Sequence, residues 1–441
     1  MEKIKKYKIV TYGCQMNIHE SEKIAGMLES RGYTYTNEVD KCDVIVFNTC
    51  CIRENAEDRA EGNIGALKKQ KKRNKNLIIA VGGCMTQQKN FADKLHKEFP
   101  FLDIIFGTHN LDDFGALLDK RLNSGKKIIE VLESEKPICE TTPKHRTSFP
   151  NAWVNITYGC NNFCTYCIVP YVRGRERSRQ MIDIINEVKD LISKGYKEIT
   201  LLGQNVNSYG KDLKNASFSA LIDEISKLDG DFRLRFMTNH PKDLTEEMVV
   251  SLSKCSHYCH SIHLPVQAGS NNILRLMNRR YTREDYLKKV EMLRAYMPDI
   301  AITTDIMVGF PTETEQDFLD TVDLCEKVKF SGAFTFIYSR REGTPADKMD
   351  GQIPYEVSSD RITRLISLIN EQNRQASLSY KGKVIEILCE GYDDKKNKFL
   401  GRDKYGRMAY FDGTNDLIGK FVNVLITKTG GISLLGEIVK G

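Results

Sequence analysis

The sequence predicts an α/β protein of three parts: a small parallel α/β domain, an incomplete (β/α)6 barrel and a small antiparallel β-barrel. Three observations lead to this fold class. Short β-branched runs alternate with amphipathic stretches, the alternation resumes on a larger scale after a proline-containing segment, and the last part has short strands without a helical period. The 441 residues suit about three domains of roughly 150 residues each. We expect the boundaries 1–148, 149–374 and 375–441.

The first part alternates strand-like and helix-like segments. KIVTY, VIVFN, LIIAV and DIIFG are typical of strands, and helices are expected over 21–29, 54–72, 88–98 and 111–122. This order predicts a parallel sheet with helices on its faces. Residues 133–150 contain three prolines and little periodicity, which indicates a linker.

The second part repeats the alternation six times. Its strand-like runs begin near Trp153, Glu198, Arg233, Ser261, Ile300 and Gly332. A full TIM barrel has eight such units, so six predict an incomplete barrel, with its chemistry at the carboxyl ends of the strands. A polar helix is expected over 355–380, and VIEILCEG, GRMAYFDG and FVNVLIT then predict the strands of the small β-barrel.

Composition narrows the class of protein. The N-terminus is charged, and no uncharged run approaches the roughly 18 apolar residues that a membrane span needs, so a cytoplasmic protein without a membrane partner is expected. The 13 cysteines are odd in number and unevenly spaced, which argues against a disulfide framework. Clustered cysteines in a reducing compartment indicate metal binding or catalysis.

Three cysteines of the first part occupy equivalent positions. Cys14 follows KIVTYG, Cys50 follows VIVFNT and Cys84 follows LIIAVGG, each just past a predicted strand. The carboxyl ends of parallel strands lie along one edge, so the three thiols are expected to converge there. Any one of them alone is explained as a buried small hydrophobe, but three matched positions favour a ligand set. The neighbouring glycines at 13, 82 and 83 indicate loops where the backbone approaches a cofactor.

A second trio lies in YGCNNFCTYC, at the end of the strand WVNIT. Its cysteines are Cys160, Cys164 and Cys167, and no second pair of cysteines is close in the sequence. A structural zinc site uses four protein ligands, whereas three thiolates leave one iron of a 4Fe-4S cluster open to another ligand. A zinc site completed by a distant residue stays open as an alternative.

The CxxxCxxC spacing after the first barrel strand resembles the radical S-adenosylmethionine (SAM) superfamily. Seven sequence motifs are similar to those of the methylthiotransferase family within this superfamily. They are TYGCQMNIHES, NTCCIREN, VGGC, CTYCIVPYVRGRERSR, LLGQNVNSYG, HLPVQAGS and VGFPTET. The resemblance covers essentially the whole chain, including a TRAM-like RNA-binding domain at its C-terminal end. Within the family the motifs are most similar to the MiaB-type branch, which adds a 2-methylthio group to N6-isopentenyladenosine in tRNA.

The resemblance implies two 4Fe-4S clusters and SAM as cofactors. Cys14, Cys50 and Cys84 would hold an auxiliary cluster that carries the sulfur, and the trio at 160, 164 and 167 would hold the cluster that cleaves SAM to a 5′-deoxyadenosyl radical. Two positions depart from the pattern: Cys51 adjoins Cys50, which puts the identity of the ligating thiol in question, and Glu20 stands in HES without an expected effect. No residue is assigned as a general acid or base.

Three further residues are expected near SAM. Tyr166 is expected against its adenine, with plain packing as the alternative. Gln204 and Asn205, after the second barrel strand, are expected at its polar end, with an Asx-type turn as the alternative.

An arginine row, Arg173, Arg175, Arg177 and Arg179, follows the trio at a spacing of two. If the segment is extended, all four guanidinium groups point one way and suit RNA phosphates. The alternative is a solvated loop paired internally with Glu176. The row and the TRAM-like barrel favour RNA binding, and the resemblance implies the anticodon stem-loop of tRNA as the partner. The resemblance also implies an electron donor such as flavodoxin or ferredoxin, and we expect a monomer.

Two other functions stay open. The same chemistry serves threonylcarbamoyl-adenosine in tRNA or an aspartate of a ribosomal protein, and a non-enzymatic, metal-stabilised RNA-binding protein would also carry the barrel and the arginine row. The cysteines of CSHYCH, residues 255–260, are expected to be buried thiols, and those at 42, 139, 325 and 389 to be packing or surface residues.

Overall fold

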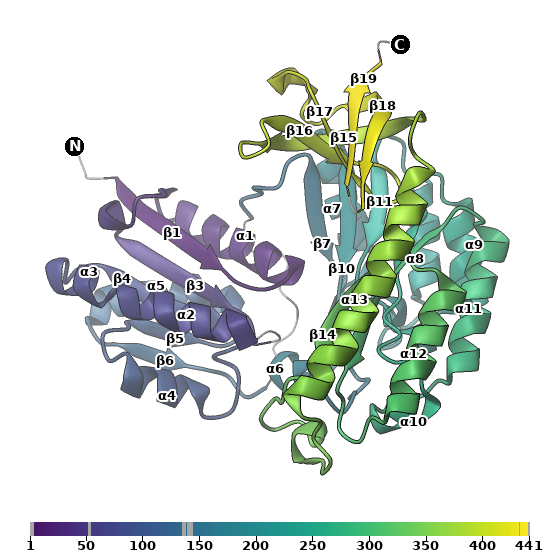
Figure 1. Cartoon of the computed structure of the whole chain (residues 1–441). Helices are drawn as coiled ribbons and strands as arrows, with labels where there is room; N and C mark the ends of the chain where they lie inside the picture. Colours follow the sequence, from purple (N-terminus) through teal and green to yellow (C-terminus); the bar gives the residue numbers. More distant parts are fainter. Residues whose placement is uncertain (1–3, 52–53, 135–137, 139–143, 432, 440–441) are drawn as a thin grey trace. The chain divides into compact units, whose positions relative to one another are not determined.

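The computed structural model describes the chain except for residues 1–3, 52–53, 135–137, 139–143, 432 and 440–441 (Figure 1). The described chain forms two compact units. The first contains residues 1–147, 158–161 and 168–177, and the second contains residues 148–157, 162–167 and 178–441. Cys139 and parts of the expected linker lie outside the described residues.

The first unit contains a parallel six-stranded sheet in the order β2-β1-β3-β4-β5-β6. Four strands confirm the predicted segments, and the two edge strands were missed because each buries only one of its three residues and so shows no apolar run. The bounds are β1 Lys5–Thr11, β2 Tyr33–Tyr35, β3 Val44–Thr49, β4 Ile78–Gly83, β5 Ile104–Phe106 and β6 Ile128–Glu130.

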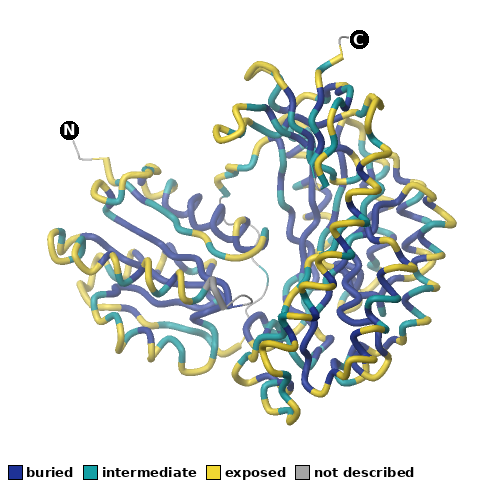
Figure 2. Tube along the Cα trace, in the orientation of Figure 1, coloured by how far each residue is buried: buried dark blue, intermediate teal, exposed yellow. Residues whose placement is uncertain are grey.

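Helices pack on both faces of this sheet. Along β3, Val44 and Val46 belong to one apolar cluster and Ile45 and Phe47 to the other, so every residue of the strand is buried (Figure 2). Burial on both faces explains the continuous apolar run in the sequence. The helices are α1 Gln15–Glu29, α2 Glu54–Ala66, α3 Lys68–Arg73, α4 Phe91–Glu98, α5 Phe114–Ser124 and α6 Val169–Arg173, with short 3-10 turns η1 Val39–Lys41 and η2 Leu111–Asp113.

The second unit contains the six predicted β/α units. Their strands form two parallel ladders, β7-β10-β11 and β12-β13-β14, and a parallel bridge joins Leu234 of β11 to Tyr258 just before β12. The prediction of an incomplete barrel is confirmed. The bounds are β7 Asn151–Asn155, β10 Glu198–Leu202, β11 Arg233–Phe236, β12 Ser261–His263, β13 Ala301–Val308 and β14 Gly332–Ile337. Two further strands of two residues, β8 Thr157–Tyr158 and β9 Arg177–Ser178, pair with each other, and each has one residue in either unit.

Local capping signals begin several barrel helices. Thr282 and Asp285 form a reciprocal capping box at α11, and Thr314 and Asp317 form one at α12. The helices are α7 Met181–Ser193, α8 Phe218–Ser226, α9 Glu246–Lys254, α10 Asn271–Leu276, α11 Arg283–Tyr296, α12 Glu315–Val328 and α13 Tyr355–Leu378, with 3-10 turns η3 Val206–Ser208, η4 Pro241–Asp243 and η5 Pro345–Lys348. Among the described helices, none combines the length and apolar character needed to span a membrane.

The C-terminal part is a closed five-stranded barrel in the order β15-β16-β17-β19-β18. Its pairs are antiparallel, as expected, except that β17 and β19 run parallel. Cys389 is fully buried in its core beside Phe411 and Val424, which confirms a packing role. The bounds are β15 Val384–Asp393, β16 Lys398–Arg402, β17 Met408–Phe411, β18 Phe421–Gly430 and β19 Ser433–Ile438, with the 3-10 turn η6 Asn415–Leu417.

Polar contacts join this small barrel to the rest of the second unit. Arg235 of β11 pairs with the buried Glu198 at 2.8 Å and donates to the carbonyl oxygen of Asp403 at 2.7 Å. Asp299 accepts a hydrogen bond from the Tyr405 hydroxyl at 2.7 Å and contacts His260 Nδ1 at 2.6 Å. Partial burial favours the neutral form of Asp299, but these hydrogen bonds outweigh it and lower the pKa to about 2.

The Asp299 contact should depend on pH. Because the pKa of Asp299 is depressed in the folded chain, its contribution is complete above pH 4 and is lost as the pH falls towards 2. We expect Asp299→Asn to lower the thermal midpoint of the second unit at pH 5 and to have little effect at pH 2. Calorimetry of both proteins from pH 5 to 2 checks this. A difference between the two midpoints that stays constant over this range would contradict the assignment.

Candidate functional site

Three thiols lie at one edge of the first unit's sheet. Cys14, Cys50 and Cys84 follow β1, β3 and β4, which are neighbours in the sheet. Thr49 of β3 is in register with Gly83 of β4, so Cys50 and Cys84 come at the same level of adjacent strands. Cys14 is exposed and is the N-cap of α1, while Cys50 and Cys84 are buried.

A fourth thiol belongs to this cluster. Cys51 is completely buried and packs with Cys84, Ile168 and Val172. Its thiol donates a hydrogen bond to Cys84, which lowers the pKa of Cys84. The positive charge of Arg173 lowers that pKa further, against the effect of burial. Since the thiolate is the form that binds metal, the environment of Cys84 fits a metal ligand.

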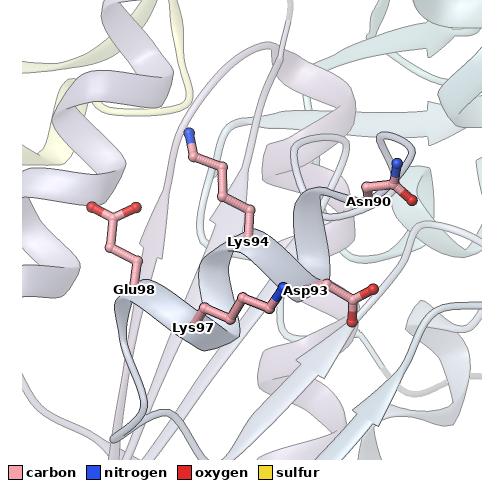
Figure 3. A pocket seen from close by; sticks show the side chains of 5 residues that line it. All are labelled: Asn90, Asp93, Lys94, Lys97 and Glu98. Atoms are coloured by element: carbon pink, nitrogen blue, oxygen red, sulfur yellow. The ribbon is translucent and has the colours of Figure 1, made fainter.

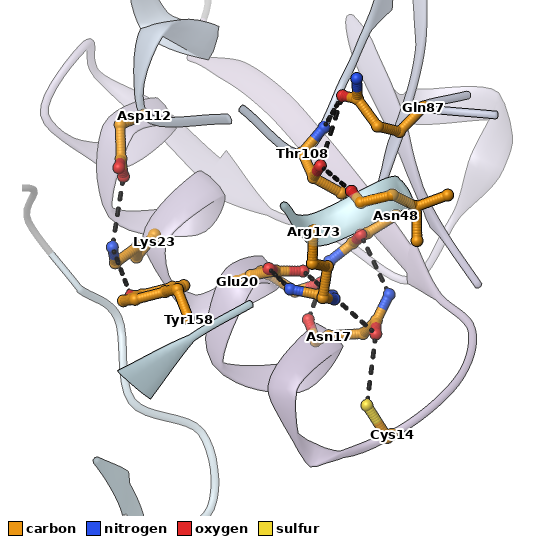
Figure 4. A network of polar contacts seen from close by, with 12 residues as sticks. Cys14, Asn17, Glu20, Lys23, Asn48, Gln87, Thr108, Asp112, Tyr158 and Arg173 are labelled. Atoms are coloured by element: carbon orange, nitrogen blue, oxygen red, sulfur yellow. Dashed lines mark hydrogen bonds and ion pairs between the residues drawn. The ribbon is translucent and has the colours of Figure 1, made fainter. Parts of the chain in front are cut away.

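Arg173 is the centre of a buried polar network (Figure 4). Its guanidinium contacts both carboxylate oxygens of Glu20, at 2.6 and 3.2 Å, and lies 3.5 Å from Asn17 Oδ1. Asn17 also accepts from the Cys14 thiol at 3.5 Å and donates to the carbonyl oxygen of Thr49 at 2.9 Å. The network therefore connects the loop of Cys14 with the end of the strand that precedes Cys50.

The glycines at this edge let protein segments approach one another. Gly13 has φ +108°, and a Cβ there would lie 2.6 Å from Cys50 Cβ. Gly83 has φ +105°, and a Cβ would lie 2.4 Å from the carbonyl oxygen of Thr49. A Cβ on Gly82 would lie 2.2 Å from the ring of Phe106. These glycines accommodate neighbouring strand ends and a core aromatic, and the approach to a cofactor stays a prediction.

Alanine at Gly83 should distort the thiol edge. The positive φ and the contact with Thr49 predict a loss of about 1–3 kcal/mol in the stability of the first unit. Gly62→Ala is the control, because Gly62 lies in α2 with open space around it and should gain roughly 0.5–1 kcal/mol. Hydrogen exchange of β3 and β4 measures both changes. Equal protection in the two variants would refute the expectation.

The second trio is divided between the units. Cys160 belongs to the first unit, where its backbone N–H donates to the carbonyl oxygen of Gly174 at 3.2 Å. Cys164 and Cys167 belong to the second unit, and the Cys167 N–H donates to the carbonyl oxygen of Cys164 at 2.9 Å. Cys164 is buried and Cys167 is half-buried.

Two side-chain nitrogen donors lie near the sulfur of Cys164. Arg279 Nη1 lies 3.4 Å from its sulfur, and Arg279 itself is buried. His240 Nε2 lies 4.0 Å from the same sulfur, while His240 Nδ1 accepts a hydrogen bond from the backbone of Lys242. That bond places the proton of neutral His240 on Nε2, facing Cys164. N–H groups directed at a cysteine sulfur suit a thiolate ligand of an iron-sulfur cluster.

The predicted SAM contacts lie in the second unit. Tyr166 packs against the main core, and its hydroxyl lies 3.5 Å from Arg279 Nη1. Asn205 is buried and donates to Asp243 Oδ2 at 2.7 Å, with no side-chain cap on η3, so the Asx-type turn is not formed by this side chain. Gln204 is half-buried.

Three buried amide groups near the ends of β10 and β11 have one half without a hydrogen-bond partner among the described residues. The unpartnered atoms are Asn205 Oδ1, Asn207 Nδ2 and Asn239 Oδ1. Asn207 Oδ1 accepts a hydrogen bond from the backbone N–H of His240, and Asn239 Nδ2 donates one to the carbonyl oxygen of His263. Buried polar atoms are rarely left unpaired, so these atoms fit a polar ligand such as the amino-acid end of SAM. Sequence reasoning missed Asn207 and Asn239, although both follow barrel strands.

The arginine row is not a single exposed face, which corrects the expectation from the sequence. Arg173 ends helix α6 and is buried against Glu20, and Arg179 is buried against Glu187 at 2.8 Å. The segment is not extended throughout, so the side chains do not alternate as a strand requires. Arg175 is exposed. Arg177 is half-buried in β9.

A separate pocket of about 630 Å³ lies on helix α4 (Figure 3). Its lining consists of charged and amide side chains of both signs, which is typical of a solvated helix surface. The lining residues are Asn90, Asp93, Lys94, Lys97 and Glu98. The pocket offers no thiol.

The three parts of the chain match known families. Residues 154–325 match the radical SAM superfamily, residues 6–107 match the family described as uncharacterized protein family UPF0004, and residues 378–439 match the TRAM domain.

Relatives that match nearly the whole chain show to which family it belongs. The chain is 52% identical over 438 residues to the tRNA-2-methylthio-N(6)-dimethylallyladenosine synthase of Clostridium perfringens (strain SM101 / Type A), covering 99% of this chain and 98% of that protein. It is 51% identical over 436 residues to the synthase of the same name from Thermoanaerobacter sp. (strain X514), covering 98% and 93%. The chain belongs to this synthase family.

Solved structures support the fold of this synthase family member. The radical SAM methyltransferase TsrM from Kitasatospora setae, solved with cobalamin and a [4Fe-4S] cluster, has a TM-score of 0.58 at 14% identity and covers 78% of this chain and 74% of its own. The cobalamin-dependent SAM radical enzyme OxsB has a TM-score of 0.53 at 14% identity, covering 84% and 56%. At these identities the likeness concerns the fold alone.

The structure changes the reading of the two departures from the family pattern. Cys51 was noted as a neighbour of Cys50 and is in contact with Cys84. Glu20 was expected to be without effect, yet it is buried and ion-paired with Arg173. No sequence signal joins Glu20 and Arg173, because they are 153 residues apart.

Proposed function

We propose that the protein is a tRNA methylthiotransferase that adds a methylthio group to C2 of N6-isopentenyladenosine, the dimethylallyladenosine in its relatives' names. The proposal rests on the 52% and 51% sequence identity to two of these synthases, which extends over 99% and 98% of the chain. The placement of the thiols at the carboxyl edges of parallel strands supports it. The three-domain division at residues 148 and 374 belongs to the same proposal.

The cysteines hold the cofactors in this proposal. Cys14, Cys50 and Cys84 bind the auxiliary 4Fe-4S cluster, and the trio at 160, 164 and 167 binds the other. When bound, the clusters and two molecules of SAM supply the sulfur and radical chemistry that C2 requires, since no side-chain base removes its hydrogen. The positive charge of Arg279 offsets the negative charge of the Cys164 sulfur, and the neutral His240 directs its Nε2–H at that sulfur.

The remaining side chains of the proposed site bind SAM and the RNA. Tyr166, Gln204 and Asn205 contact SAM, and the unpartnered amides of Asn207 and Asn239 complete its polar surroundings. The TRAM barrel binds the anticodon stem-loop, with phosphate contacts from the exposed Arg175. The protein acts in the cytoplasm as a monomer, with an electron donor such as flavodoxin or ferredoxin.

The test is a competition between substrates. Protein reconstituted anaerobically is incubated with SAM, a reductant and equal amounts of isopentenylated tRNA, threonylcarbamoylated tRNA and ribosomal protein. We expect about eight irons per chain and a 2-methylthio product only on the isopentenylated nucleoside, detected by mass spectrometry of digested tRNA. Product on another substrate, or two or fewer irons after careful reconstitution, would refute the proposal.

A further inference from the structure

One face of the β12-β13-β14 ladder carries exposed aromatic side chains. Phe334 and Phe336 of β14 are 58% and 36% exposed. In the parallel register Phe334 pairs with Asp305 and Phe336 with Met307, so these four side chains share one face. The other face of β13 is buried in the main core. In a (β/α) barrel the face opposite the helices is the interior, so Met307, Phe334 and Phe336 form an apolar strip there, named the β14 strip.

A polar pair borders the β14 strip. The ring of His263 lies against Phe334, with centroids 5.9 Å apart and planes at 71°. His263 Nε2 lies 3.4 Å from Asp305 Oδ2, and its Nδ1 lies 3.0 Å from the Thr303 hydroxyl. An apolar strip beside hydrogen-bonding groups suits a ligand that is apolar at one end and polar at the other.

The β14 strip is linked to the cysteine site through a short path in the second unit. His263 ends β12, and Pro265 follows two residues later. The carbonyl oxygen of Pro265 accepts a hydrogen bond from Arg279 Nη2 at 2.7 Å, and Nη1 of the same guanidinium contacts Cys164 Sγ at 3.4 Å. Arg279 therefore joins the segment that follows His263 to the sulfur of Cys164.

We propose that the β14 strip binds the dimethylallyl group on N6 of the target adenosine, while His263 and Asp305 face the edge of the purine. The inference rests on the proposed function and identifies the residues that select its substrate. A five-carbon apolar group gains by leaving water against two aromatic rings and a thioether. A threonylcarbamoyl group is disfavoured at the β14 strip, because its carboxylate would be repelled by the carboxylate of Asp305.

The test compares two anticodon stem-loop RNAs that differ only in the dimethylallyl group. Their affinities for the reconstituted full-length protein are measured by fluorescence anisotropy. We expect the wild type to prefer the dimethylallylated RNA, and the Phe334→Ala/Phe336→Ala variant to lose at least about tenfold of that preference with unchanged affinity for the unmodified RNA. Phe334→Leu/Phe336→Leu should keep most of the preference. Leu319→Ala is the matched control, because Leu319 is 43% exposed on α12, away from the strip.

Two outcomes would overturn the inference: an alanine variant that keeps the wild-type preference, or one that loses affinity for both RNAs equally. Product formation by the wild type tests the proposed function separately. Methylthiolated product together with an undiminished preference in the variant overturns only the role of the β14 strip. No product on the dimethylallylated RNA overturns the proposed function as well.

Discussion

Replacing Cys160, Cys164 and Cys167 by alanine is expected to lower the iron content from about eight to about four per chain and to reduce cleavage of SAM to background. The reason is coordination: a cluster held by only three thiolates has no spare protein ligand. The two N–H groups directed at Cys164 would then face a methyl group and lose their acceptor. Iron analysis, electron paramagnetic resonance and release of 5′-deoxyadenosine measure the effect.

Two variants make this result specific. Alanine at Cys14, Cys50 and Cys84 should also leave about four irons but should retain SAM cleavage, because the other trio is intact. Cys325→Ala removes a buried thiol of the second unit outside both trios and should keep all the iron. An unchanged iron content together with undiminished deoxyadenosine release in the 160/164/167 variant would overturn the assignment of that trio.

Replacing Arg173 by alanine is expected to destabilise the first unit by about 3–5 kcal/mol, because it leaves the Glu20 carboxylate buried without its partner. Only 6% of each side chain is exposed, so water does not replace the lost contact. Asn17, which connects Arg173 to the Cys14 loop, loses one contact as well. Hydrogen exchange of β1, β3 and β4 in the reconstituted protein measures the change.

Matched variants distinguish the stabilising effect of the buried Arg173–Glu20 pair from that of an exposed ion pair. Lys120→Ala breaks the exposed pair with Glu130 in the same unit and should cost no more than about 1 kcal/mol. The Arg173→Ala/Glu20→Ala double variant should be less destabilised than the sum of the single variants, because neither charge is left alone. A cost for Arg173→Ala as small as that for Lys120→Ala would mean that the buried pair does not stabilise this edge.

The elements with strong local patterns were predicted from the sequence. Four strands of the first unit and the six barrel strands were found because they contain short apolar, β-branched runs, which are continuous in strands buried on both faces such as β3 and β4. The convergence of Cys14, Cys50 and Cys84 followed from the strand order that βαβ connections favour. The edge strands β2 and β6 were missed because only one of the three residues in each is buried, whereas the equally short β5 is buried throughout.

The side-chain partners were decided by tertiary contacts. Arg173 was predicted as an exposed phosphate ligand, but helix α6 turns it into the protein against Glu20. The close approach of Gly13 to Cys50 and of Gly83 to Thr49 was not predicted. Neither outcome can be derived from spacing, because each depends on a residue that is distant in the sequence.

The sequence by itself determined the fold class, the cysteine positions at strand ends and the family, because periodicity and local motifs are properties of short segments. Only the tertiary structure decided which thiol contacts Cys84, which amides are left unpartnered, and that Phe334 and Phe336 share a face with Met307 and Asp305. The physical reason is that burial, charge pairing and register are set by segments that meet only when the chain has folded.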